Sequence, residues 1–384
     1  MAAVNWGPWL RLWSEEWVRS ADPQDLVPEV VRDKWLGFEP ADEAAVVAAE
    51  DRLGVRLPPS YREFLLTTDG WRNAGMFVWR LRDTSNLGWL RDIEPFWAGD
   101  WEGLEGEPEP DDDNKFTRGL MISLEADAGV LFLDPGDVDE AGEWAAYSLF
   151  TWRAEAPSRF ASFTALMQDL YAEFHQMLKP PGTTRDSWDA KVEQARLDAL
   201  AGDVDGAGAV LAQAEEFGRI RATVLRAQLE LVLGNDYQAG MLFSRLLRPG
   251  FMPEGFLTDP LFTDELLPWL FVEQERSPGY RSSILQSALI GDRPEIREAI
   301  DAGQIRRDHT EPNYGNPEFD MLVKRALGEH ADDPEALWHA VIEAMPRWRP
   351  RTVDHIAPVA LLVSPVLAAI WTRDRGRELL SIPI

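Results

Sequence analysis

Two segments between residues 38 and 67 carry apolar side chains at helical spacing. The first presents one face formed by Val46, Val47, Glu50 and Leu53. Gly54 follows this face directly, and glycine readily takes the left-handed conformation in which many helices end. The pattern therefore predicts a helix that ends beside Gly54.

The second segment follows a hinge at Leu57, because a proline holds the residue before it in an extended conformation. Pro58 and Pro59 lead into the helix, and Ser60 is a candidate N-cap. The apolar face of this helix consists of Tyr61, Phe64 and Leu65. Asp69-Gly70 then supplies a tight turn into a strand.

Further along, continuous apolar runs replace the helical spacing. The runs 119–124 and 129–136 are bounded by turn residues and predict the two strands of a hairpin. A second helical stripe follows, formed by Phe160, Phe163, Leu166, Met167, Leu170 and Phe174. This stripe predicts an amphipathic helix that closes the region.

The two ends of the chain also carry apolar patterns. Near the start, an amphipathic helix is predicted by Trp6, Trp9, Leu10, Trp13 and Trp17, which lie beside Glu15 and Glu16. Its polar face holds few cations, so packing on the domain or on a partner is favoured over a membrane interface. The segment also lacks the pattern of a targeting peptide. The apolar run 356–371 is short for a bilayer and contains prolines, so we interpret it as a buried terminal helix or helix pair.

A linker at residues 180–185 marks a change in character, since Ala and Leu at helical spacing dominate beyond it. Residues 200–208 can be laid over residues 232–240, which aligns Gly202 with Gly234 at an offset of 32. This period resembles the stacked helix pairs of tetratricopeptide repeats, and 186–249 is the repeat-like part. Later segments near Gly291 and Ala302 have a faint ankyrin character, and a helical bundle without repeats is the alternative.

The segment from Phe38 to Trp71 resembles the signature of the SUKH superfamily, which includes the Smi/Knr cell-wall regulators and many bacterial immunity proteins. The residues that carry the likeness are Glu50, Leu53, Gly54, Leu57, Pro58, Tyr61, Phe64, Leu65, Asp69 and Gly70. The usual Asn-Gly turn is Asp69-Gly70 in this chain. The later hairpin and helix extend the likeness to about residue 178. The resemblance implies an α+β fold in which helices flank an antiparallel sheet, and most of these side chains are expected to be framework.

Composition sets the domain count. A chain of 384 residues is too long for a single domain with one hydrophobic core. Its 45% apolar residues, with 17 tryptophans, are enough to form large cores. We expect a Trp-rich extension at 1–37, a SUKH-like domain at 38–179, the linker, and an all-α, solenoid-like domain at 186–384. The sequence contains no cysteine, which excludes disulfides and thiolate zinc sites and suits a cytoplasmic location.

The net charge of −28 narrows the choice of partner. Phosphate binding needs a basic surface, so nucleic acid is not expected as a direct ligand. A cationic protein is the natural complement, and the field of the chain would speed the encounter. Between residues 101 and 150 the chain holds 14 acidic and two basic side chains.

The acidic excess is concentrated in one glycine- and proline-rich segment that is predicted to be a long exposed loop. Its partner-binding candidates are Glu105, Glu107, Glu109, Asp111, Asp112 and Asp113. A solvated insertion without function is the alternative. Calcium binding is not expected, because the loop lacks the spaced ligands and the glycine of an EF-hand.

Aromatic residues lie just before the acidic segment. The candidates for a partner-binding surface are Trp71, Trp79, Trp89, Trp97 and Trp101, and Phe77 and Phe96 lie among them in the sequence. Tryptophan can anchor a protein interface, although a domain of this size also buries several in its core. Trp97 and Trp101 are the leading candidates because they adjoin the acidic segment.

Catalytic and cofactor motifs are absent from the sequence. The five histidines form no zinc motif, and His330 and His339 are interpreted as solvated side chains near helix ends. The chain has no dinucleotide-binding or phosphate-cradling glycine loop and no nucleophile elbow. We therefore expect neither a cofactor nor a metal, and no enzymatic activity.

The sequence predicts a non-enzymatic protein that binds other proteins. The resemblance implies an immunity protein that blocks a cognate toxin, for which the charge favours a cationic, nuclease-type partner. The alternative is an intracellular scaffold or regulator that uses both the SUKH-like and the helical domain, since repeat-like helices offer extended binding surfaces.

Overall fold

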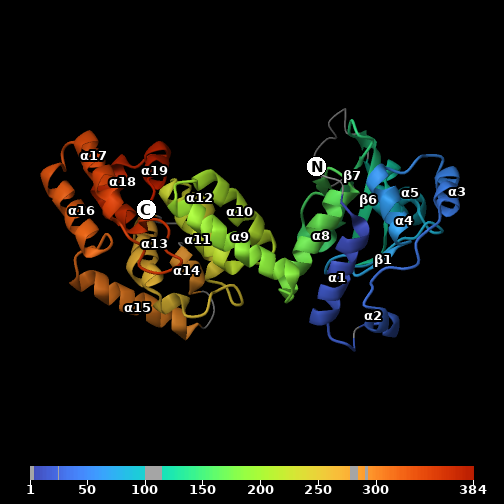
Figure 1. Cartoon of the computed structure of the whole chain (residues 1–384), viewed down its shortest axis with the longest axis horizontal. Helices are drawn as coiled ribbons and strands as arrows, with labels where there is room; N and C mark the ends of the chain where they lie inside the picture. The colour runs from blue at the N-terminus through green and yellow to red at the C-terminus, as the bar shows by residue number, and fades with distance from the viewer. Residues whose placement is uncertain (1–3, 25, 100–114, 277–283, 290–292) are drawn as a thin grey trace. The chain divides into compact units, whose positions relative to one another are not determined.

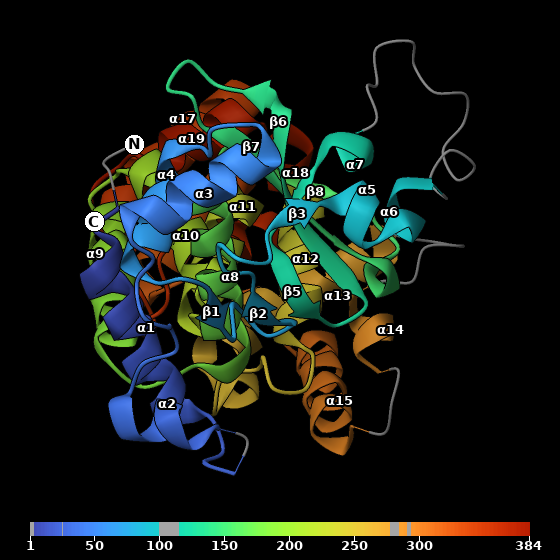
Figure 2. The ribbon, with the colours of Figure 1, turned by 90° about the vertical axis from the view of Figure 1, so that its right-hand side faces the viewer.

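The computed structural model describes residues 4–24, 26–99, 115–276, 284–289 and 293–384. The chain divides into two compact units, Met1–Arg185 and Asp186–Ile384. The first unit combines antiparallel sheets with flanking helices, and the second is helical (Figures 1 and 2). The α+β fold class predicted from the sequence is confirmed.

The first unit begins with four helices, α1 (Trp6–Ser20), α2 (Pro28–Asp33), α3 (Glu43–Leu53) and α4 (Pro59–Thr67). Its strands are β1 (Trp71–Arg72), β2 (Val78–Leu81), β3 (Gly88–Trp89), β4 (Leu120–Met121), β5 (Ser123–Ala126), β6 (Gly129–Val138), β7 (Trp144–Phe150) and β8 (Ser158–Phe160). Short helices α5 (Leu90–Ile93), α6 (Pro95–Gly99), α7 (Lys115–Arg118) and η2 (Thr151–Arg153) connect the strands, and the closing helix is α8 (Phe163–Leu178).

The strands form two antiparallel sheets. The smaller has the order β1-β2-β5, and the larger has the order β3-β4-β6-β7-β8. The predicted hairpin at 119–136 is present, but its first strand divides at Ile122 so that β4 joins the larger sheet and β5 the smaller. β7 was not predicted, although it is buried at every position. Its run Trp-Ala-Ala-Tyr-Ser-Leu-Phe lacks the alternation of a half-exposed strand.

Both faces of the larger sheet are covered. Helices α4 and α8 pack on one face, where α1 joins them through close ring contacts of Trp6 with Phe64 and Phe163. The prediction that the Trp-rich first helix packs on the domain is thereby confirmed. On the other face, a separate apolar cluster is formed by Leu90, Phe116, Met121, Val130, Phe132, Ala145, Tyr147 and Leu149. Because side chains alternate along β6, this strand contributes to the apolar layers on both faces of the sheet.

The motif residues are framework. The carboxylate of Glu50 accepts a hydrogen bond from the Leu57 backbone at 3.0 Å and so fixes the hinge between α3 and α4. Asp69 accepts bonds from the Thr84 backbone at 2.7 Å and the Thr84 hydroxyl at 2.8 Å. Gly70 has φ +98°, the left-handed region that favours glycine in this turn. The prediction of a framework role holds for these side chains.

Two local expectations were wrong. Ser60 does not cap α4, because the helix begins at Pro59 and Ser60 lies inside its first turn. Its backbone N–H and hydroxyl both donate to Glu143 instead, at 2.8 and 2.6 Å. Phe160 belongs to β8 and not to the closing helix, which Ser162 caps through the Ala165 backbone.

The second unit consists of helices and loops throughout its described residues. Its first helix, α9 (Thr183–Leu200), begins three residues before the unit boundary. It is followed by α10 (Val204–Glu216), α11 (Ile220–Val232), α12 (Asp236–Leu246), η3 (Phe256–Thr258), the π-helix η4 (Phe262–Leu266), α13 (Leu267–Arg276) and α14 (Ile284–Ala288). The remaining helices are α15 (Pro294–His309), α16 (Pro317–Glu329), α17 (Pro334–Ala344), η5 (Met345–Arg347), η6 (Val359–Val363), α18 (Pro365–Ile370) and α19 (Arg373–Leu380).

The proposed repeat coincides with two similar helix pairs. Gly202 ends the turn after α9, and Gly234 lies at the same point after α11, with φ +97° and +72°. Beyond α12 the helix lengths vary and the pattern stops. The run 356–371 forms η6 and α18, with Leu361 and Leu367 fully buried. No helix among the described residues is both long enough and apolar enough to cross a membrane.

Candidate functional site

The predicted tryptophans lie in different environments. Trp71 is fully buried, with its ring 5.9 Å from Trp13 and 5.2 Å from Trp35, so it presents no surface to a partner. Trp79 is 51% exposed. Trp89 and Trp97 are half-buried, and Trp97 packs against the apolar cluster beneath α5 and α7. Phe96, next to Trp97, is 63% exposed.

The remaining predicted residues lie in the segment 100–114, outside the described residues. They are Trp101, Glu105, Glu107, Glu109, Asp111, Asp112 and Asp113. Trp79 is therefore the most exposed predicted tryptophan whose position is described.

Trp79 belongs to the smaller sheet, whose outer face carries a row of charged side chains. Arg72 on β1 is the register partner of Arg80 on β2, and Arg80 is the partner of Glu125 on β5. The neighbouring Trp71, Val78 and Leu81 are buried. We define the outer sheet face as Arg72, Trp79, Arg80 and Glu125.

The two arginines of this face form a like-charged pair directly opposite each other. Such pairs destabilise a sheet, so the surrounding structure has to compensate for the repulsion. The ring of Phe38 lies beneath both guanidinium groups, at 3.8 Å from Arg72 and 5.0 Å from Arg80. Arg72 also donates to the backbone oxygen of Gly37 at 2.9 Å. Burial, and then the charge of Arg80, lower the pKa of Arg72 from its usual value.

Arg80 retains unused hydrogen-bonding capacity. Its Nε is buried and has no hydrogen-bond partner among the described residues. A buried donor without a partner is costly, so this side chain is held at some expense to the stability of the fold. A carboxylate has the charge and the acceptor geometry for a guanidinium.

Trp79 projects from the face because of a β-bulge. Val78 pairs with Ala126 and Arg80 with Glu125, so two residues of β2 advance while β5 advances by one. The extra residue is Trp79, whose backbone oxygen accepts from the Asn73 N–H at 2.8 Å. Bulges re-aim side chains and are over-represented near functional sites. The bulge here holds a large aromatic side chain in solvent.

A second exposed aromatic lies at the end of this sheet. Trp152 is 48% exposed and packs edge-on against Phe77, with ring centroids 4.8 Å apart. Its indole N–H donates to the Asp127 oxygen at 3.0 Å, and the Asp127 N–H donates to the Phe77 oxygen at 2.9 Å. Arg153 lies 5.1 Å from the Trp152 ring and pairs with Glu173 at 2.5 Å. These contacts hold the exposed indole in one orientation.

The outer sheet face and Trp152 have the composition of a protein-binding surface. Tryptophan and arginine dominate the energetics of protein interfaces, and both residue types are exposed or half-buried in this part of the chain. The described residues contain no group of three or more side chains that could hold a metal. The arrangement therefore suits recognition of another protein.

The sequence argument missed Arg72, Arg80 and Trp152. Period-two alternation in Trp71-Arg72 and Arg80-Leu81 places both arginines on the outer face of their strands, and this signal was available. The pairing of β1 with β2 could not be predicted from the sequence, because the turn between these strands has no hairpin signature. Trp152 follows β7, which was also missed.

Residues 40–169 match the model of the SMI1 / KNR4 family (SUKH-1). The match covers the motif segment, both sheets and the first part of α8, and it confirms the resemblance drawn from the motif. No curated protein and no solved structure was found to match the chain. A family of this kind is consistent with a role in binding other proteins.

Proposed function

We propose that the SUKH-type domain binds a protein partner through the outer sheet face, and that the partner is a toxin which the chain neutralises. The observation that carries this proposal is Trp79, half exposed on a bulge beside two half-buried arginines. An exposed indole at this position does not stabilise the fold, whereas it would stabilise a protein interface.

Two kinds of side chain would contribute to binding, namely aromatic anchors and charged groups. Trp79 and Trp152 supply apolar area that a partner would desolvate, and such anchors contribute about 2 kcal/mol or more each in known interfaces. Arg72 and Arg80 would receive an acidic side chain of the partner.

The partner is proposed to be cationic overall, of the nuclease type. The support is the net charge of −28 and the acidic residues 105–113, which would pair with the cations that such a toxin uses to hold phosphate. In this arrangement the partner's active site is covered by binding alone. The proposal requires no catalytic step in this chain.

The test is capture of the partner from the native host with the tagged full-length chain, followed by mass spectrometry at low and raised salt. One stoichiometric, basic protein that inhibits growth when produced alone supports the proposal. Its loss from the Trp79→Ala and Trp152→Ala variants, but not from Val138→Ala, would locate the contact at the outer sheet face and Trp152. Val138 is a suitable control because it is 48% exposed on another strand.

A scaffold that binds several partners is the second candidate. It is favoured by the second unit, whose 199 residues (186 to 384) exceed what a simple blocker requires. Several captured proteins, none of them toxic, would favour the scaffold and contradict the immunity function.

A further inference from the structure

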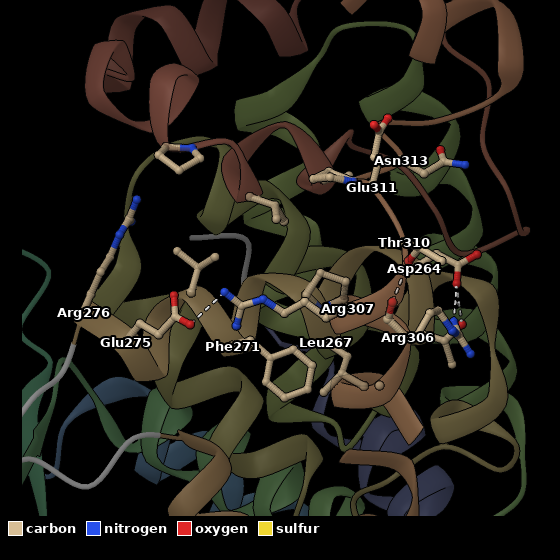
Figure 3. Close-up of a pocket in the computed structure, with 18 residues that line it drawn as sticks. Asp264, Leu267, Phe271, Glu275, Arg276, Arg306, Arg307, Thr310, Glu311 and Asn313 are labelled. Atoms are coloured by element: carbon tan, nitrogen blue, oxygen red, sulfur yellow. Dashed lines mark hydrogen bonds and ion pairs between the residues drawn. The ribbon is translucent and has the colours of Figure 1, made fainter. Parts of the chain in front are cut away.

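The second unit contains a cleft that the proposed function does not use. Its volume is about 740 Å³, and it lies between α13, the C-terminal part of α15 with the loop that follows, and the segment from η6 to α18 (Figure 3). Clefts of about 300–1,000 Å³ are typical of small-molecule sites. The cleft therefore has the size for a small organic ligand.

The floor of the cleft is apolar. Leu267 and Phe271 lie one turn apart on α13, on the same side of the helix, and Figure 3 shows both between the two ends of the cleft. Val272 and Val363 add further apolar surface and are only half-buried. An apolar ligand body would release water from this strip.

A glycine sets the width of the cleft. A Cβ at Gly303 of α15 would clash with the Leu267 side chain, so the glycine lets α15 approach α13 closely at this point. Beyond Gly303, residues 304–313 are exposed, whereas on the facing side of α13 Leu267 and Phe271 are buried and Val272 is half-buried. The Thr310 hydroxyl closes the helix by donating to the Arg306 oxygen at 2.7 Å.

Two ion pairs mark the ends of the apolar strip. Arg306 contacts Asp264 at 2.8 Å, and Arg307 contacts Glu275 at 2.7 Å. Asp264 and Glu275 are eleven positions apart, which corresponds to about 16 Å along a helix. Consecutive arginines of α15 thus point to opposite ends of one elongated cleft (Figure 3).

The two ends differ in charge. At the Arg306 end, Asp264 pairs with Arg306 and lies 3.6 Å from Arg351, and Glu311, which also lines the cleft, pairs with Lys324 at 3.9 Å. At the Arg307 end, Arg276 also borders the cleft, so the lining residues there carry two guanidinium groups and one carboxylate, Glu275, which pairs with Arg307. Arg307 lies 5.8 Å from the centroid of the Phe271 ring, next to the apolar floor. A guanidinium has five N–H donors, so Arg307 can serve a second carboxylate beside Glu275.

We propose that this cleft binds a small elongated carboxylate, whose apolar chain lies over Leu267 and Phe271 and whose anionic end contacts Arg307 and Arg276. The inference does not depend on the toxin-binding function, since it concerns the second unit alone. The excess of guanidinium at one end selects an anion over a cation. The uninterrupted apolar strip selects a chain-like body.

The test measures binding of decanoate, decanol and decylamine to the full-length chain by titration calorimetry at low salt. The expected order is decanoate, then decanol roughly tenfold weaker, and decylamine weakest, since one charge-assisted contact contributes about 1.4 kcal/mol. Absence of decanoate binding, or equal affinity for all three head groups, would overturn the proposal.

Two pairs of variants test separately the contribution of the charged end and that of the apolar part of the cleft. Arg307→Gln should weaken decanoate about fivefold or more and leave decanol unchanged. Arg297→Gln is the matched control, because Arg297 is exposed on the same helix and does not line the cleft. Val272→Trp should fill the cleft and abolish binding of both probes, whereas Ile305→Trp, at a 63% exposed position of α15 outside the cleft, should not. Equal losses in variant and control would contradict the assignment, and circular dichroism verifies that each variant is folded.

Discussion

Arg72 and Arg80 lie directly opposite each other on two antiparallel strands, and both guanidinium groups rest against the ring of Phe38. The pair costs stability, because like charges in register repel. An anionic group of a partner would be attracted by both positive charges. The pair therefore lowers the stability of the fold and favours the binding of an anion.

Arg80→Gln should therefore weaken partner binding without destabilising the fold. We expect the free energy of unfolding to change by less than about 1 kcal/mol, because lost repulsion offsets lost packing. Affinity for the captured partner should fall about tenfold or more. Both quantities are measured against Arg91→Gln, whose side chain is 55% exposed on α5. A strong loss of stability in Arg80→Gln would show that the arginine serves the fold instead.

Trp71 and Trp79 should respond in opposite ways to truncation. Trp71→Ala leaves a cavity in the core and should cost about 3–5 kcal/mol of stability. Trp79→Ala removes an exposed side chain and should stay within about 0.5 kcal/mol. Hydrogen exchange of the amides in α4 and α8 reports on the first unit alone. A large cost at Trp79 would be incompatible with an exposed anchor.

Glu265 should make the second unit less stable as the pH rises. The side chain is fully buried, and burial raises its pKa to about 7, although Arg351 at 2.9 Å and the Ala360 N–H at 2.6 Å oppose the shift. Since the folded pKa exceeds the unfolded value, the folded state binds this proton more tightly, and stability falls between pH 4.5 and 7. The change is about 3 kcal/mol for a shift of this size.

The comparison with Glu265→Gln isolates this proton from the neighbouring groups. His355 and Asp264 also face the site, and burial lowers the pKa of His355 to about 3, so its contribution runs in the opposite direction. The variant should gain stability relative to the parent between pH 5 and 8, as judged by exchange of α13 amides. Glu295→Gln, at a 53% exposed site, should show no such gain. A pH-independent difference would refute the expectation.

Glu16 should have the opposite dependence in the first unit. Burial alone would raise its pKa, but bonds from His175 at 3.0 Å, Tyr171 at 2.5 Å and the Thr184 N–H at 3.0 Å together hold it below the usual value. Its stabilisation is therefore present above pH 4.5 and is lost as the pH falls below that value. Glu16→Gln should cost about 2–3 kcal/mol at pH 7, since the bonds involve a charged group. Hydrogen exchange of the α1 amides, measured at pH 7 and pH 4, reports the difference in stability between the parent and Glu16→Gln. This difference should be smaller at pH 4.

The acidic segment should govern the association rate and not the dissociation rate. Replacing Asp111, Asp112 and Asp113 by Asn should slow association with the partner and flatten its salt dependence. The matched control neutralises the same number of exposed acids elsewhere in the unit, at Asp51, Glu140 and Glu155. Stopped-flow binding at several salt concentrations measures both. An unchanged rate in the segment variant would remove it from the mechanism.

Sequence reasoning recovered the elements whose signals are local. Gly54, Asp69-Gly70 and the Trp-rich first helix each depend on nearest neighbours or on helical spacing, and the structure confirms all three. The outer sheet face depends on strand register between residues far apart in the chain, which one sequence does not encode in a readable form. Trp71 shows the same limit, since a tryptophan in a short strand gives no sign of which face is buried. Glu265 and Arg351 meet across 86 positions, so their pairing was equally hidden.

The short strand β1 has a further consequence for recognition. Its free edge is already covered, since Trp71 bridges to Gly37 and the Arg72 N–H donates to the Leu36 oxygen at 3.0 Å. An incoming chain therefore finds no unpaired backbone row on this side of the smaller sheet. Strand addition, which reads main-chain geometry and accepts many sequences, is blocked at this edge. A partner has to be recognised through side chains, and the specificity of the complex should accordingly change with single substitutions on the outer sheet face.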